Sequence, residues 1–146
     1  MCGIAGLLGR SPGTFADSVG PALAHRGPDD AGTWQDDRCC LVHRRLAIQP
    51  MRSACGRWLR VFNGEIYNHQ ELRRELINEG HRFQGTGDTE VLLAWLVSRG
   101  EAGLARLRGM AAFCLYDRQE HTALLGRDPH GIKPLYLWQG ARGELA

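Results

Sequence analysis

The sequence Met1-Cys2-Gly3-Ile4-Ala5-Gly6 opens the chain, and the interpretation of every later segment depends on it. A cysteine directly follows the initiator methionine, so removal of Met1 would give Cys2 a free α-amine. That amine, with an ordinary pKa of about 7.7–8.0, can accept the proton of a thiol whose ordinary pKa is about 8.5. The segment therefore fits two structures: an N-terminal nucleophile, or simply the beginning of a buried strand over residues 3–8.

The composition is that of one globular domain. The chain has 146 residues, 43% of them hydrophobic and 23% charged, and a chain of this size buries roughly 70% of its unfolded surface. The formal net charge of +2 is small and the arginines are scattered, so we predict no nucleic-acid partner. No stretch is long and apolar enough for a membrane span, and we predict no membrane partner.

The cysteines indicate a reducing compartment and no metal site. The chain contains Cys2, Cys39, Cys40, Cys55 and Cys114. They form no C-x-x-C pair, and no histidine lies at metal-ligand spacing from any of them. Because their number is odd and the first residues do not resemble a secretory signal peptide, we predict reduced thiols and a cytoplasmic location.

Strand patterns stand on both sides of a helical region. Strands are expected over residues 3–8, 39–48, 58–62, 110–116, 122–126 and 135–138, and helices over 15–24, 69–79 and 88–99. Asn63-Gly64 follows the strand pattern of residues 58–62, where this dipeptide predicts a tight hairpin turn. Asp88 is expected to cap the last of these helices.

A basic cluster, His43-Arg44-Arg45, lies inside the apolar run of residues 39–48. An arginine within a buried strand is costly unless a counter-charge faces it. We therefore expect at least one of Arg44 and Arg45 to have an acidic partner. The alternative is an edge strand with exposed arginines.

Six short segments, taken in their order along the chain, indicate a resemblance to one protein family. They are MCGIAG (1–6), HRGPD (25–29), HRRLAI (43–48), FNGEIYN (62–68), GDTE (87–90) and RDPHGIKPLY (127–136). Together they resemble the glutaminase domain of class II glutamine amidotransferases of the asparagine synthetase type, over essentially the whole chain. This resemblance implies the N-terminal-nucleophile hydrolase fold, an α+β, four-layer α/β/β/α sandwich of two antiparallel sheets.

The resemblance also implies catalytic roles. Cys2 corresponds to the nucleophile, and its freed α-amine to the proton acceptor and later donor. Asn63 and Gly64 correspond to an oxyanion hole made of a side-chain amide and a backbone N–H. One donor of this kind typically contributes about 10²–10³ in kcat.

Substrate-binding residues follow from the same resemblance. Arg45 corresponds to the residue that grips the α-carboxylate of glutamine, a task that suits a planar guanidinium with two parallel donors. Ile48, in the same segment, is expected to contact the substrate. Glu65 and Asp88 correspond to the acceptors of the α-ammonium group, so Asp88 is more than a helix cap.

The chain departs from the family pattern in three respects. Ile48 runs directly into Gln49-Pro50 where the family has a longer loop, so we expect fewer backbone contacts to glutamine and weaker affinity. Arg44 stands where an acidic residue is common. The Ser-Gly-Gly-x-Asp-Ser nucleotide-binding loop is missing, so we expect residues 1–146 to form a single glutaminase domain, truncated at its C-terminal edge and without the synthetase domain. This domain is expected to need no cofactor; ATP and Mg²⁺ would belong to the synthetase.

The functional hypothesis is glutamine hydrolysis that supplies ammonia for an asparagine-synthetase-like amide transfer. Its partners would be glutamine and a C-terminal synthetase domain or partner chain, with a homodimer as a further option. Two alternatives stay open. If Met1 is retained, the chain would be a non-catalytic binding or interaction module; otherwise the ammonia could serve a different acceptor.

Overall fold

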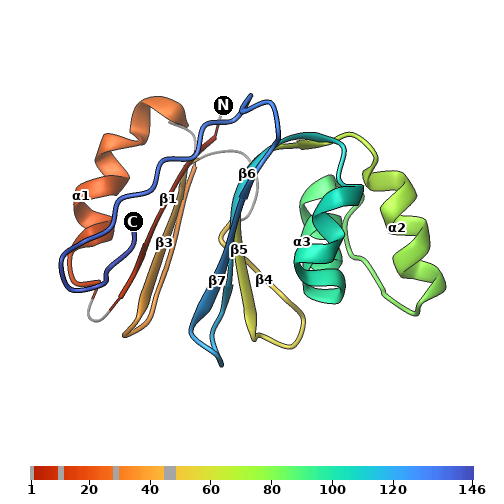
Figure 1. Cartoon of the computed structure of the whole chain (residues 1–146), viewed down its shortest axis with the longest axis horizontal. Coiled ribbons are helices and arrows are strands. Elements are labelled where there is room, and N and C mark those ends of the chain that lie inside the picture. Colours follow the sequence, from red (N-terminus) through yellow and green to blue (C-terminus); the bar gives the residue numbers. More distant parts are fainter. Residues whose placement is uncertain (1, 10–11, 28–29, 45–48) are drawn as a thin grey trace.

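Two antiparallel β-sheets stacked face to face form the centre of the molecule (Figure 1). The computed structural model describes residues 2–9, 12–27, 30–44 and 49–146. The three-stranded sheet has the order β1-β3-β2, and the four-stranded sheet has the order β4-β5-β6-β7. The strands are β1 (Gly3–Leu8), β2 (Ala31–Gln35), β3 (Cys39–Arg44), β4 (Met51–Arg52), β5 (Trp58–Ile66), β6 (Gly109–Asp117) and β7 (Thr122–Arg127).

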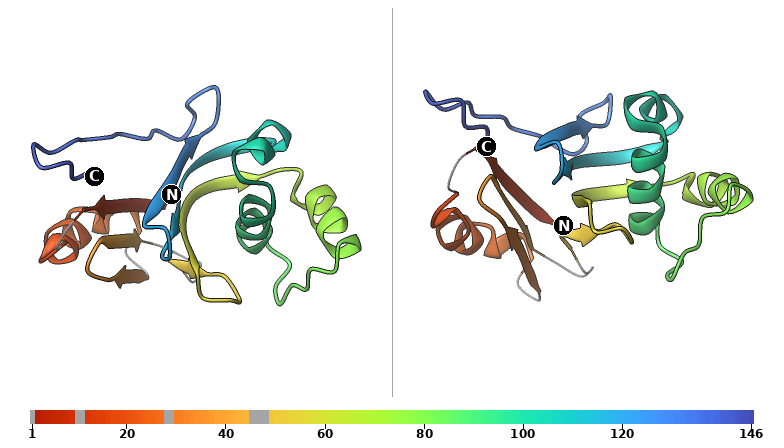
Figure 2. Two further views of the ribbon diagram at one scale, coloured as in Figure 1. Left: turned by 60° about the horizontal axis from the view of Figure 1, so that its bottom comes forward. Right: turned by 90° about the horizontal axis from the view of Figure 1, so that it is seen from below.

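Helices cover the outer face of each sheet (Figure 2). Helix α1 (Phe15–Ala22) lies against the three-stranded sheet, while α3 (Asp88–Arg99) packs on the four-stranded sheet and α2 (His69–Asn78) packs beside α3. Short 3-10 segments follow α1 and α3: η1 (Ala24–Arg26) and η2 (Gly100–Arg106). The layer order, helix–sheet–sheet–helix, confirms the predicted α+β sandwich.

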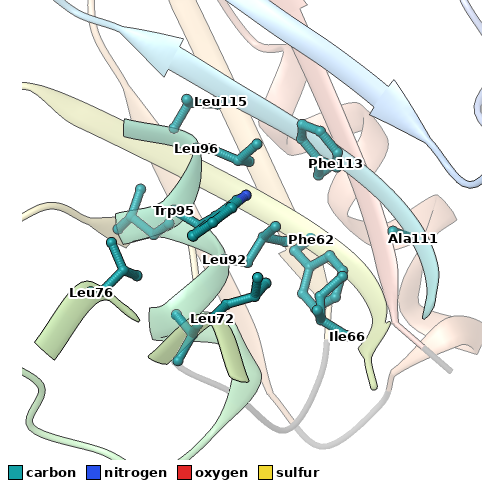
Figure 3. Packing of buried hydrophobic residues seen from close by; sticks show 12 residues of the cluster. Phe62, Ile66, Leu72, Leu76, Leu92, Trp95, Leu96, Ala111, Phe113 and Leu115 are labelled. Atoms are coloured by element: carbon teal, nitrogen blue, oxygen red, sulfur yellow. The ribbon is translucent and has the colours of Figure 1, made fainter. Parts of the chain in front are cut away.

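The larger core lies between β5, β6 and α3, and α2 adds to it from the far side of α3 (Figure 3). Successive side chains of a strand point to opposite faces, and on β5 the helix-facing positions include Phe62 and Ile66. Helix α3 meets them with Leu92 and Trp95, which are at most 1% exposed. The apolar spacing in the sequence therefore predicted both the helix and its buried side.

The second core lies between the two sheets. Its buried members are Cys39, Leu41, Leu59, Val61, Cys114 and Tyr116. On β5 these are the odd-numbered positions, so the face that carries Leu59 and Val61 is turned toward the three-stranded sheet. An apolar cavity of about 240 Å³ adjoins this core, lined by residues that include Ile4 and Val61.

The predicted hairpin turn at Asn63-Gly64 is wrong. Both residues lie inside β5, which stays paired with β6 through Ile66. Gly64 has φ 157°, and a Cβ at this position would lie 2.0 Å from the carbonyl oxygen of Met110. Glycine is thus required by the close approach of β6 and not by a turn.

The predicted strand over residues 135–138 is also wrong. In the described part of the chain this segment forms no strand: Trp138 exchanges two backbone hydrogen bonds with Ala146, and the nearby pairing consists of isolated bridges, Leu8 with Leu145 and Gln139 with Leu145. A segment with strand propensity forms a strand only where a neighbouring strand is available to pair with it. The last segment instead returns toward the three-stranded sheet (Figure 1) and leaves Tyr136 and Trp138 exposed.

Candidate active site

Cys2 lies half-buried directly before β1, at the edge where Gly3 pairs with Arg44 of β3. Gly3 is buried, and a Cβ there would lie 3.0 Å from the Cβ of Arg26 and 3.3 Å from that of Leu23. The glycine therefore allows the first strand to pass closely beneath η1. Met1 is outside the described residues.

The structure brings Cys2 and Asn63 to the same end of the sandwich. Cys39 pairs with Leu8, the last residue of β1, and belongs to the same buried cluster as Leu59 near the beginning of β5. Because strands are extended, the far end of β5, where Asn63 lies, must be near the beginning of β1. Asn63 is half-buried and lies on the face of β5 that is turned toward the three-stranded sheet.

The backbone N–H of Gly64 points away from β6. Its register partner is Ala111, whose backbone is engaged on the opposite side: Ala111 N donates to Asp128 Oδ2 at 3.2 Å, and Asp128 N donates to Ala111 O at 2.8 Å. Gly64 and Ala111 are therefore a non-hydrogen-bonded pair of the antiparallel ladder. The Gly64 N–H therefore faces the other edge of β5, where no strand of the described residues pairs with it.

Two side chains bind that same edge on either side of Gly64. The N–H of Phe62 donates to Gln49 Oε1 at 2.7 Å, and the N–H of Ile66 donates to Asp88 Oδ2 at 2.9 Å. Residues 62, 64 and 66 present their N–H groups to one side because a strand alternates every second residue. The Gly64 N–H is consequently flanked by two neighbours that already have acceptors.

The prediction that Asp88 caps α3 is wrong. Gly87 is the N-cap, and Asp88 is the first helical residue with no side-chain cap hydrogen bond. Its carboxylate instead accepts from Ile66 N and, through Oδ1, from the hydroxyl of Thr89 at 3.2 Å. Asp88 thereby connects the beginning of α3 to the end of β5 that carries Asn63, and Glu65 lies exposed on the same end.

The predicted contacts of Arg45 and Ile48 fall on residues 45–48, outside the described part of the chain. Arg44, their described neighbour, donates from Nε to the carbonyl of Gly20 at 3.1 Å. This bond joins β3 to α1. In the described part of the chain, the partner found for Arg44 is thus a backbone carbonyl, where the sequence predicted a carboxylate for at least one of Arg44 and Arg45.

The sequence predicted no role for three buried polar residues in or beside β5: His43, Gln49 and Arg60. Arg60 is completely buried, with its guanidinium 5.0 Å from the ring of Phe62; burial lowers its pKa to about 9. Burial and the nearby Arg60 lower the pKa of His43 to about 4, so this imidazole is neutral at pH 7. His43 had a signal as part of the basic cluster in an apolar run, and Arg60 had one as an arginine inside the strand pattern of residues 58–62.

The other buried thiols are poorly suited to act as nucleophiles. Burial raises the pKa of Cys39 and Cys40, and raises that of Cys114 to about 12. These thiols stay protonated near neutral pH, and the thiolate is the reactive form. Cys55 is exposed in the turn after β4, away from the end of the sandwich that carries Asn63. It forms a hydrogen bond with the Ser53 hydroxyl in which either group could be the donor.

Residues described by the structure include no group of three or more His, Cys, Asp or Glu side chains arranged to hold a metal ion. The described helices likewise include none that is long and apolar enough to cross a membrane.

Comparison with known sequences identifies a family and several relatives. A family model described as a glutamine amidotransferase domain matches residues 1–146. The glutamine-hydrolyzing asparagine synthetase 1 of Bacillus subtilis (strain 168) is 39% identical over 150 residues, which cover 93% of this chain and 24% of that protein. The glutamine-hydrolyzing asparagine synthetase B of Escherichia coli (strain K12) is 41% identical over 130 residues, covering 84% of this chain and 23% of that protein.

Solved structures with the same fold have more distant sequences. Glutamine phosphoribosylpyrophosphate amidotransferase from Bacillus subtilis, complexed with ADP and GMP, superposes with a TM-score of 0.79 at 22% identity. The match covers 99% of this chain and 41% of that one. The chain spans about a quarter of the length of the curated relatives it matches, whose matched shares are 24% and 23%.

Proposed function

Because the chain belongs to the glutamine amidotransferase domain family, we propose that it hydrolyses glutamine to glutamate and ammonia. The observation that carries this proposal is the arrangement at one end of the sandwich. Cys2 directly precedes β1 there, and the Gly64 N–H lies on the edge of β5 that faces away from β6, where Asp88 binds the nearby Ile66.

In the proposed reaction, Met1 is first removed so that the α-amine of Cys2 is free. The amine accepts the thiol proton, and the thiolate attacks the side-chain carboxamide carbon of glutamine. The Asn63 amide and the Gly64 N–H donate hydrogen bonds to the oxygen of the tetrahedral intermediate. The ammonium of Cys2 returns its proton to the leaving ammonia, and water then hydrolyses the γ-glutamyl thioester to give glutamate and the free thiol.

We assign recognition of the amino-acid end of glutamine to three charged residues and one apolar residue. Asp88 and Glu65 would accept hydrogen bonds from the α-ammonium group; the Asp88 carboxylate is already oriented by the Ile66 N–H at 2.9 Å. Arg45 would bind the α-carboxylate through two parallel donors, and Ile48 would contact the substrate from the same segment.

We further propose that the ammonia serves a synthetase of the asparagine synthetase type, because the relatives carry that name and are about four times longer than this chain. ATP and Mg²⁺ would act in that domain or partner. Exposed apolar side chains near the end of the chain support such a partner: Ile132, Tyr136, Leu137 and Trp138 are each at least 57% exposed. The odd number of cysteines supports a cytoplasmic location.

The direct test is a comparison of wild type with Cys2→Ala in an assay of glutamine-dependent ammonia release. Cys2→Ala should abolish release, whereas Cys55→Ala, which removes an exposed thiol in the turn after β4, should leave it unchanged. Activity retained by Cys2→Ala would remove the nucleophile from the proposal.

Intact-mass measurement of the same samples separates the alternative function. Loss of one methionine residue is required for catalysis by Cys2. A protein that keeps Met1 and releases no ammonia would instead be the non-catalytic binding module.

A further inference from the structure

The side chain of Gln49 takes the place of a strand beside Phe62. Its Oε1 accepts the Phe62 N–H at 2.7 Å, and its Nε2 donates to the Phe62 carbonyl at 3.2 Å. β4 pairs with β5 only at Leu59 and Arg60, opposite Arg52 and Met51. Gln49 therefore continues the β4 edge by one further pair, using a side-chain amide where a backbone would normally stand.

These two hydrogen bonds are buried. Gln49 is 6% exposed and Phe62 is 2% exposed. A buried backbone donor or acceptor that loses its partner costs about 1–3 kcal/mol, so the pairing strongly restrains where the Phe62 backbone can lie.

The backbone of Gln49 lies directly against the three-stranded sheet. A Cβ on Gly32, in β2, would lie 1.7 Å from the carbonyl oxygen of Gln49. Only a glycine permits this approach. Gln49 thus lies between β2 of one sheet and Phe62 of the other, in contact with the first and hydrogen-bonded to the second.

We propose that Gln49 is a positioning residue for the oxyanion donors, acting through Phe62, which directly precedes Asn63 and Gly64. This inference rests on the proposed function. Donors of an oxyanion hole must be held within a few tenths of an ångström, and a displacement of about 1 Å can reduce catalysis about 10²-fold. Gln49 restrains the strand at Phe62, before Gly64, and Asp88 restrains it at Ile66, after Gly64.

The informative variant is Gln49→Glu, which keeps the shape of the side chain. When protonated, its carboxyl can accept from Phe62 N–H and donate to Phe62 O, as the amide does. When ionised, it is acceptor-only and faces the Phe62 carbonyl with a second oxygen. At pH 8 we expect kcat to be about 10- to 100-fold below that of wild type at the same pH, and we expect this ratio to approach one as the pH is lowered. KM for glutamine should change less than about 3-fold, because Gln49 binds Phe62 whereas Asp88, assigned to the α-ammonium group, binds Ile66.

Gln70→Glu is the matched control, since it makes the same substitution at an exposed position of α2. It should leave both kcat and its pH profile as in wild type. Gln49→Leu, which can neither donate nor accept, should lower kcat at every pH without recovery. Each variant is assayed at a temperature where circular dichroism shows it to be folded.

A folded Gln49→Glu or Gln49→Leu enzyme with wild-type kcat would overturn the positioning role, because Gln49 would then serve only stability. An equal loss for Gln49→Glu at all pH values would also overturn it. Failure of the proposed function has a different signature: the wild-type protein, with Met1 removed, would release no ammonia.

Discussion

His43 should make the stability of this protein depend on pH between about 6.5 and 4. The imidazole is fully buried on β3. Burial lowers its pKa most, the positive charge of Arg60 lowers it further, and Asp30 and the Phe62 backbone oppose the shift only in part, so the pKa in the folded protein is about 4. The unfolded chain has the ordinary value of about 6.5.

The direction of this pH dependence follows from which state, folded or unfolded, binds a proton on His43. Between pH 6.5 and 4 the unfolded chain takes up a proton on His43 and the folded protein does not, so the free energy of unfolding decreases as the pH falls. The contribution of neutral His43 is complete above pH 6.5. A difference of about 2.5 pKa units corresponds to about 3 kcal/mol, a large part of the roughly 5–15 kcal/mol that stabilises a typical domain.

The measurement is urea unfolding followed by tryptophan fluorescence at pH 7.0, 5.5 and 4.2, for wild type and His43→Leu. The wild type should lose about 3 kcal/mol more than His43→Leu across this range, because leucine has a similar volume and no proton to bind. His130→Gln, at an exposed position, should keep the wild-type slope. If His43→Leu loses stability as steeply as wild type, the imidazole is not the group that titrates, and the reasoning is refuted.

Two further substitutions test other buried features. Arg60→Met should raise the free energy of unfolding by about 1–3 kcal/mol, because it replaces a buried charge with an apolar side chain. It should also raise the pKa of His43, and the same urea series measures both effects. A destabilised variant would show that the guanidinium is well paired. Gly64→Ala should lower the free energy of unfolding by at least about 2 kcal/mol, since its methyl group would overlap the Met110 carbonyl at 2.0 Å; a wild-type urea midpoint would show that β6 can move away.

Local patterns predicted most of the elements. The spacing of Leu92 and Trp95 indicated a helix with one buried side, and α3 packs in that way. Alternation over residues 58–62 indicated a strand, which the structure extends to Ile66. These predictions succeeded because period and burial of one face can be read from neighbouring residues.

The errors arose where a local preference met a distant partner. Asn63-Gly64 favours a turn on its own, but β6 pairs with it from almost 50 residues further along the chain, Gly64 opposite Ala111. Asp88 favours a cap on its own, but the Ile66 N–H at 2.9 Å engages its carboxylate instead. In both cases a tertiary contact overrode the intrinsic preference.

The sequence by itself determined the family, the two-sheet fold and the residues proposed for catalysis, because short motifs in a fixed order carry that information. Only the tertiary structure decided that the Gly64 N–H faces the edge of β5 away from β6 and that Gln49 and Asp88 bind the same edge on either side of it. The physical reason is that strand register sets the direction of each N–H. Register depends on pairing between segments far apart in the chain, which no local pattern encodes.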